Sequence, residues 1–186
     1  MRFALLAALI LAPVALAADT KKAGGVKSVE ATFDPPEAKP GQTVTFKLTV
    51  TLEDGYHTYP LVQTDKAAEG MVNKLEFPKG GAVVFVGDTF DPSGGKTKAE
   101  PALCIKEMLV FEGTVVYQRK AVVPPTAKAG ELTVQVPKFV LSVCDKDNCF
   151  PPKTLKPEAK LKVLDGPAVE VDKKYAAEVE KAAKDK

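Results

Sequence analysis

Hydrophobic and polar residues alternate strictly between Val44 and Leu52, where each apolar side chain is followed by a Thr or a Lys. A period of two over this length predicts a β-strand with one buried face. Turn-forming residues flank the run, with KPGQ (39–42) before it and EDG (53–55) after it.

Further alternating or β-rich runs follow, and Pro and Gly separate them at short intervals. In chain order they are VNKLEFP, AVVFVG, MLVFEGTVVYQRKAVVP, GELTVQVPKFVLSV and AKLKVL. Short strands divided by turn residues predict an all-β sandwich. The chain shows no Gly-rich phosphate loop and no βαβ alternation, which argues against a Rossmann or thioredoxin-like domain.

Two later segments break the strand pattern. Residues 87–103, GDTFDPSGGKTKAEPAL, are polar and rich in Gly and Pro, and predict a long loop that is either a functional lid or an ordinary surface connection. Near the C-terminus, Asp172 is a candidate N-cap, and the apolar residues after it fall at helical spacing. Most of them are Ala, so we expect this helix to dock only weakly.

The N-terminus predicts export. An early positive charge, an apolar run over residues 3–16 and a final ALA (15–17) are typical of a secretory signal peptide, and the run is shorter than the ~20 residues of a spanning helix. We therefore expect a signal peptide over 1–17, a flexible leader over 18–27, a β-sandwich domain over 28–166 and a charged helical tail over 167–186. The mature chain should be periplasmic or otherwise exported, without stable insertion in a membrane.

Charge and cysteine content narrow the function. The chain has 26 Lys and Arg against 24 Asp and Glu, and no basic stripe with interleaved aromatic residues, so nucleic acid is a poor candidate partner. One domain of this length can bury a core without covalent staples. The three cysteines are too few for a disulfide scaffold, and their odd number leaves one over.

Two of the three cysteines lie in SVCDKDNCFPPKT (142–154), after the strand-forming KFVLSV. The DKDN between Cys144 and Cys149 favours a hairpin turn, which would place the cysteines opposite each other at a Cα separation of about 4.5 Å. A disulfide spans such a distance, and closing so short a loop stabilises the fold by only ~2 kcal/mol. Pro151 and Pro152 confine the following segment to a sheet edge, where a partner's thiolate could reach the sulfur.

From these residues alone, three roles stay open for the pair: a structural hairpin disulfide, a redox disulfide, or a metal site. Zinc would need four ligands, which only Cys104 and His57 could complete, and a blue-copper site would need two His where the chain has one. Cys104 lies among apolar residues, so we expect a buried, inert thiol. His57 alone indicates a packed or surface side chain rather than a ligand.

The chain resembles a known family in two motifs. VCDKDNCFPPKT is similar to the C-x5-C-[YF]-P-P end of the N-terminal periplasmic domain of the thiol:disulfide interchange protein DsbD, with four residues between the cysteines instead of five. TLEDGYHTYP resembles that domain's aromatic DGYYLY-type segment, and LEFPKGGAVVF echoes a further strand region. The resemblance spans about Val29 to Val163.

This resemblance implies an immunoglobulin-like β-sandwich with a redox disulfide, Cys144–Cys149, at one end. It implies no cofactor, and a cap loop whose aromatic ring, here Phe90, shields the disulfide, with His57 and Tyr59 lining the site. By the family's order, Cys149 would be the sulfur that links to a partner. The electron donor would be a thioredoxin-like domain or a membrane-embedded thiol reductase on another polypeptide.

We therefore predict an all-β, immunoglobulin-like β-sandwich with a short C-terminal helix. It would pass reducing equivalents to oxidised exported proteins through Cys144 and Cys149, which would make it a protein-disulfide reductase module if it is active. The alternative is a non-catalytic immunoglobulin-like interaction domain with a structural hairpin disulfide. In either case we expect a Cys144–Cys149 disulfide and a free Cys104.

Overall fold

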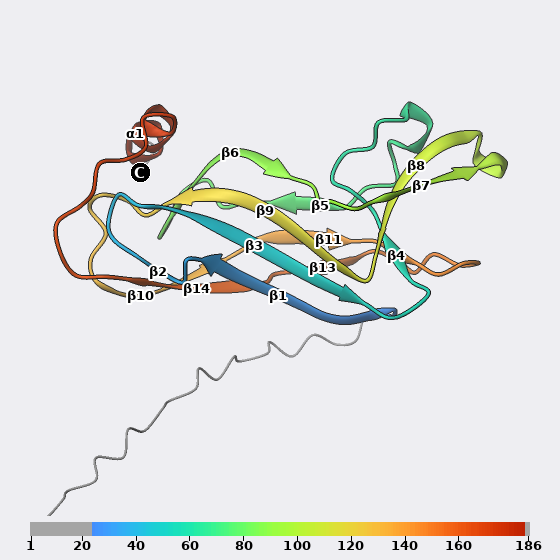
Figure 1. The fold of residues 1–186 in the computed structure, drawn as a ribbon, viewed down its shortest axis with the longest axis horizontal. Coiled ribbons are helices and arrows are strands. Elements are labelled where there is room, and N and C mark those ends of the chain that lie inside the picture. Colours follow the sequence, from blue (N-terminus) through green and yellow to red (C-terminus); the bar gives the residue numbers. More distant parts are fainter. Residues whose placement is uncertain (1–23, 185–186) are drawn as a thin grey trace, which may run out of the picture.

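The computed structural model describes residues 24–184, which form a β-sandwich with a smaller sheet at one end (Figure 1). One layer has the strand order β1-β3-β9-β6, formed by Val26–Asp34, Thr43–Leu52, Thr114–Val122 and Val84–Phe90. The other layer contains two three-stranded sheets. The sheet β10-β14-β2 is formed by Gly130–Gln135, Glu158–Val163 and Glu37–Ala38, and the sheet β13-β11-β5 by Lys153–Leu155, Lys138–Leu141 and Lys74–Glu76.

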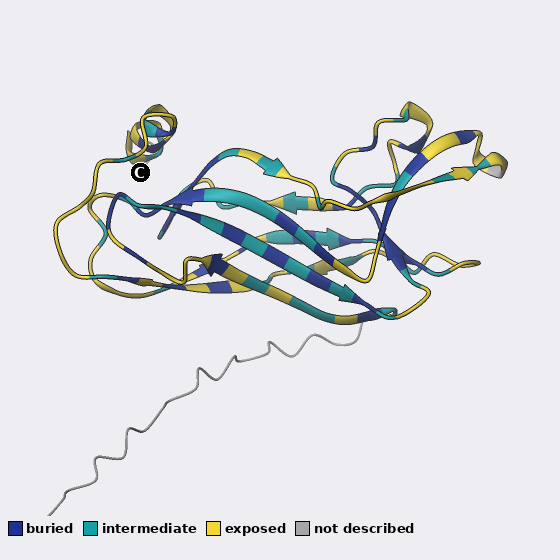
Figure 2. Cartoon of the chain, viewed as in Figure 1, coloured by how far each residue is buried: buried dark blue, intermediate teal, exposed yellow. Residues whose placement is uncertain are grey.

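Strand β3 has the alternation that its sequence predicts. Its even-numbered apolar residues are buried, and its Thr and Lys residues are half-buried on the other face (Figure 2). The buried side chains join those of β9, β11 and β14 in one apolar core between the layers. Phe46 lies inside this core and makes edge-to-face contacts with Phe33, Phe77 and Phe85, with ring centroids 5.6 Å apart in each pair.

The sheet at the end of the sandwich has the order β12-β4-β8-β7. Its strands are Val143–Cys144, His57–Thr58, Ile105–Glu112 and Lys96–Glu100, with short 3₁₀ turns η1 at Lys66–Ala68 and η2 at Pro101–Leu103. β8 leads into β9 through Gly113, whose φ of 68° suits glycine. The run MLVFEGTVVYQRKAVVP therefore supplies two strands, which belong to different sheets.

The predicted long loop over 87–103 is wrong. This segment contains the end of β6, the strand β7 and the turn η2, and β7 pairs antiparallel with β8. β7 is an edge strand, and its residues are exposed or half-buried. It therefore lacks the apolar alternation by which half-buried strands are recognised.

The C-terminal helix α1 (Ala176–Lys184) docks more firmly than its Ala-rich face predicts. Tyr175 and Val179 are buried against Val84 and Val86 of β6. Upstream, the Asp172 carboxylate accepts a hydrogen bond from the Lys174 N–H in the turn that precedes the helix. Two large side chains are thus enough to seat the helix on the sheet.

The fold class is confirmed: the described chain is a β-sandwich of largely antiparallel sheets with one short C-terminal helix. β1 begins at Val26, so the last two residues of the expected leader are already strand. The predicted signal peptide, 1–17, lies outside the described residues. Among residues 24–184, no helix has both the length and the apolar character needed to cross a bilayer.

Candidate functional site

A disulfide joins Cys144 and Cys149 across a tight hairpin at the end of the molecule away from α1 (Figure 1). The two residues form an antiparallel bridge, and their Cα atoms lie 4.0 Å apart. The expected pairing across a four-residue turn is therefore confirmed, and Cys104 is free.

Backbone and side-chain hydrogen bonds shape the turn between the cysteines. The Asp145 carboxylate accepts from the backbone N–H groups of Asp147 (2.8 Å) and Asn148 (2.7 Å), and the Asp145 N–H donates to the Asn148 carbonyl (2.9 Å). Asp residues favour such turns because their side chains bond the backbone a few residues on. The two N–H donors lower the pKa of Asp145, which keeps a negative charge beside the disulfide.

The two sulfur-bearing residues differ in access. Cys144 is only 3% exposed and packs in a small apolar cluster with Tyr59, Ile105 and Met108, whereas Cys149 is exposed. The Tyr59 hydroxyl lies 2.9 Å from Sγ of Cys144 and 3.7 Å from Sγ of Cys149. Because a disulfide sulfur carries no proton, the tyrosine is the donor in both contacts.

Strand β4 and the residue after it bring His57 and Tyr59 to the disulfide. His57 is the register partner of Cys144 in the pairing of β4 with β12, and its ring lies edge-to-face with Tyr59 at a centroid distance of 5.7 Å. Burial, with a smaller contribution from Lys98, lowers the pKa of His57, and burial raises the pKa of Tyr59. Both side chains therefore favour their neutral forms beside the sulfurs.

A buried polar network, which the sequence analysis missed, holds this arrangement in place. Asn73 is 1% exposed, and its amide nitrogen lies 2.8 Å from both Thr58 Oγ1 and the Tyr59 carbonyl oxygen. Its amide oxygen accepts from the Ser142 N–H, and the Tyr117 hydroxyl donates to the Tyr59 carbonyl. Asn73 thus ties the strand that carries Tyr59 to the hairpin that carries the cysteines. In the sequence, a single Asn before a short strand gives no signal of this role.

Two further residues that the sequence singled out are Phe90 and Cys104. Phe90 ends β6 and is 59% exposed, and the aromatic side chain whose hydroxyl contacts the sulfurs is that of Tyr59. Shielding of the disulfide by Phe90 stays a prediction. Cys104 is exposed rather than buried, because it ends the surface turn η2, where Leu103 is also exposed. Across residues 24–184, no cluster of three or more His, Cys, Asp and Glu side chains is arranged as a metal site.

The geometry allows one kind of chemistry directly. A thiolate arriving from solvent can reach the Cys149 side, while Cys144 is covered. If the bond opened, the Cys144 sulfur would leave as a thiolate next to a hydroxyl donor. A hydrogen bond to a charged group is stronger than one between neutral groups, so Tyr59 would favour that leaving group.

Comparisons with known proteins leave the family open. None of the protein-family models matches the chain, and a search of curated proteins finds no match. Among solved structures, one match is a chain of a type I cohesin–dockerin complex from Clostridium thermocellum, with 12% identity, 73% of this chain and 99% of that chain covered, and a TM-score of 0.42.

Proposed function

We propose that this chain is an exported thiol–disulfide interchange module in which Cys144 and Cys149 carry the electrons. The observation that carries the proposal is the asymmetric disulfide, with Cys149 at the surface and Cys144 buried under the Tyr59 hydroxyl. The motif resemblance to the N-terminal domain of DsbD supports it from the sequence. Its donor would be a thioredoxin-like domain or a membrane-embedded thiol reductase on another chain, and its acceptors would be oxidised exported proteins.

The proposed transfer of electrons takes two thiol–disulfide exchange steps. A donor thiolate attacks Sγ of Cys149, which forms a mixed disulfide while Cys144 leaves with the electron pair as a thiolate. The donor's second thiolate then attacks the donor sulfur of the mixed disulfide, which releases Cys149 as a thiolate. The donor is thereby oxidised to a disulfide, and this chain is reduced. The same steps in reverse reduce an oxidised acceptor. The Asp145 carboxylate disfavours free thiolates near the turn, so exchange is expected within specific complexes.

A second candidate function is a non-catalytic interaction domain in which the disulfide is structural. It is favoured by the burial of Cys144, which is 3% exposed and packs with Tyr59, Ile105 and Met108 in a small apolar cluster. In that case the bond would tie the exposed turn to this cluster and would not cycle.

The reduction potential distinguishes the two functions. Structural disulfides typically lie below about −300 mV, and labile ones lie higher. We expect the mature protein, equilibrated in dithiol redox buffers and quantified by peptide mapping, to give a value above this limit. A Cys104→Ser variant measured in parallel excludes scrambling through the exposed third thiol. A potential well below the limit would favour the structural disulfide.

A second experiment asks how the two aromatic side chains affect reduction of the disulfide. The predicted shielding by Phe90 implies that Phe90→Ala speeds reduction by dithiothreitol, whereas the Tyr59 hydrogen bond implies that Tyr59→Phe slows it, because the donor to the leaving Cys144 sulfur is lost. The two variants separate these assignments because Tyr59→Phe keeps the ring and removes only the hydroxyl. If dithiothreitol reduces the disulfide of the Phe90→Ala variant at the wild-type rate, Phe90 does not shield the disulfide.

A further inference from the structure

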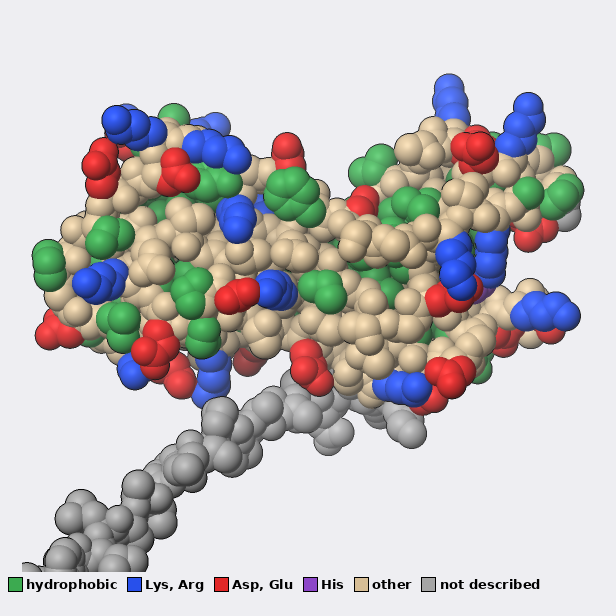
Figure 3. All heavy atoms as spheres, viewed as in Figure 1, with side chains coloured by type: hydrophobic (Ala, Val, Ile, Leu, Met, Phe, Trp, Pro, Cys, Tyr) green, Lys and Arg blue, Asp and Glu red, His purple; other side chains and the backbone are tan. Residues whose placement is uncertain are grey.

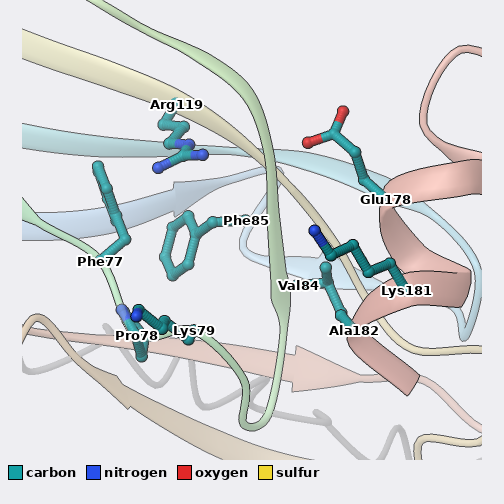
Figure 4. Close-up of a pocket in the computed structure, with 9 residues that line it drawn as sticks. All are labelled: Phe77, Pro78, Lys79, Val84, Phe85, Arg119, Glu178, Lys181 and Ala182. Carbon is teal, nitrogen blue, oxygen red and sulfur yellow. The ribbon is translucent and has the colours of Figure 1, made fainter. Parts of the chain in front are cut away.

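A groove lies between the C-terminal helix and the sandwich (Figure 4). The helix α1 is at the end of the molecule opposite β4 and β8 of the disulfide end (Figure 1). Its volume is about 540 Å³, within the range of small-molecule sites in proteins. Arg119 and the Phe77 and Phe85 rings form one side, and α1 contributes Lys181 from the other (Figure 4).

Lys and Arg side chains are interspersed with Asp and Glu over the face of the molecule drawn in Figure 3. The charged side chains that line the groove, in contrast, are mostly cations. Arg119, Lys79 and Lys181 face it, against a single carboxylate, Glu178. That carboxylate already accepts the backbone N–H of Gly87 on β6, at 3.0 and 3.3 Å from its two oxygens. Glu178 therefore fastens the helix to the sheet, and the three cations outnumber it, so the lining of the groove is net positive.

The guanidinium of Arg119 lies over an aromatic ring at the edge of the groove. Its guanidinium carbon lies 4.9 Å from the centroid of the Phe77 ring, and its Nε is buried and is the one buried side-chain N or O atom among residues 24–184 that lacks a hydrogen-bond partner. Glu178 and Asp88 are the acids whose charges act on it. Arg119 as a whole is half-buried, and its one buried, unpaired N–H has a cost that an anion beside the guanidinium would offset. Its planar fork fits a carboxylate or a phosphate with two parallel hydrogen bonds.

The wall beside the guanidinium is apolar. The Phe77 and Phe85 rings lie 4.4 Å apart between centroids, and Val84 and Ala182 continue the lining toward the helix. A bare inorganic anion would leave this surface wet, whereas a ligand with a hydrocarbon portion would cover it.

We propose that this groove binds a small amphipathic anion, whose carboxylate or phosphate head lies against Arg119 and Lys181 and whose short apolar body covers Phe77 and Phe85. The proposal is independent of the disulfide chemistry, because the groove shares none of these residues with the cysteine site.

The test is an isothermal titration of the mature protein with hexanoate, hexyl phosphate and uncharged hexanol. We expect saturable binding of at least one anionic probe, weaker binding at higher salt, and none of hexanol. The tighter of the two anions identifies the head group that the site prefers. Arg119→Gln should weaken binding by about tenfold or more, and Arg119→Lys by less, because the charge stays but the fork is lost.

Two further variants keep the test decisive. Lys181→Gln changes an exposed helix residue and should weaken binding several-fold without affecting folding, even if Arg119→Gln proves unstable. Lys160→Gln, a matched loss of charge in the exposed Lys160–Glu131 pair outside the groove, should leave binding unchanged. The proposal is overturned if neither anion binds saturably, if hexanol binds as well as the anions, or if the folded Arg119 and Lys181 variants bind like wild type.

Discussion

The body of the sandwich and its disulfide end are held together by different forces. In the body, Phe46, Leu48 and Val50 of β3 are fully buried in one apolar core, and long paired strands satisfy the backbone. At the disulfide end the strands are short, the apolar cluster is small, and side chains take over the pairing of backbone groups. Asn73 does so between β4 and the cysteine hairpin.

Gln63 pairs with backbone groups in the same way, on β8 and at Met71. Its amide accepts the Leu109 N–H and donates to the carbonyls of Leu109 and Met71, as a neighbouring strand would. Asp65 accepts N–H groups from Lys106 and Glu107 in a similar way. The stability of the body therefore depends on how much apolar area is buried, whereas the geometry of the disulfide end depends on single polar side chains.

The largest effect should come from the body. Phe46→Ala removes a fully buried ring at the centre of three aromatic contacts, and we expect it to lower the free energy of unfolding by about 3–5 kcal/mol, measured by urea denaturation. Phe90→Ala is the matched control, because Phe90 is mostly exposed and its loss should cost less than about 0.5 kcal/mol. Similar losses for the two variants would contradict the placement of the core.

The next effect tests the polar end. Asn73→Ala leaves the Ser142 N–H without its acceptor, and it removes the donor to the Tyr59 carbonyl and the Thr58 hydroxyl oxygen. We therefore expect the free energy of unfolding to fall by about 2–3 kcal/mol in the same urea assay. It should also change the rate of disulfide reduction by dithiothreitol, which Phe46→Ala should leave unchanged under native conditions. Gln135→Ala, which removes an exposed amide, is the control and should alter neither quantity. An unchanged reduction rate in Asn73→Ala would show that the network does not position the sulfurs.

Reduction of the disulfide should lower the free energy of unfolding by less than either of these substitutions. Because the bond closes a loop of only about six residues, we expect the reduced protein to lose about 2 kcal/mol and to stay folded at room temperature. Thermal melts with and without reductant, on a Cys104→Ser background, measure the difference. Unfolding on reduction would mean that the bond is a structural staple, and it would remove the main physical support for the redox proposal.

The smallest effect is a pH dependence from His57, the only histidine of the chain. Burial holds its pKa below the ordinary value of 6.5, so the unfolded state takes up a proton at a higher pH than the folded state does. The stability that this adds is fully present above about pH 6.5 and is lost as the pH falls through the depressed folded pKa. Melting temperatures between pH 7 and 5 should therefore fall more steeply for wild type than for His57→Gln. Parallel curves would contradict the burial of this ring.

Local patterns determined much of this protein. The alternation in β3, the strand-rich runs around it and the DKDN turn predicted the sandwich and the Cys144–Cys149 hairpin, because these features depend on residues close together in the chain. The expectation that His57 and Tyr59 line the disulfide came from the motif resemblance and not from a local pattern.

Tertiary structure alone decided the rest. The edge strand β7 owes its form to pairing with β8, and its exposed faces left no alternation in the sequence. Asn73 meets Ser142 from 69 positions away, and Arg119 meets the C-terminal helix only because that helix folds back over β6. Burial of a polar side chain depends on which distant backbone groups the fold brings to it, and no local pattern encodes that.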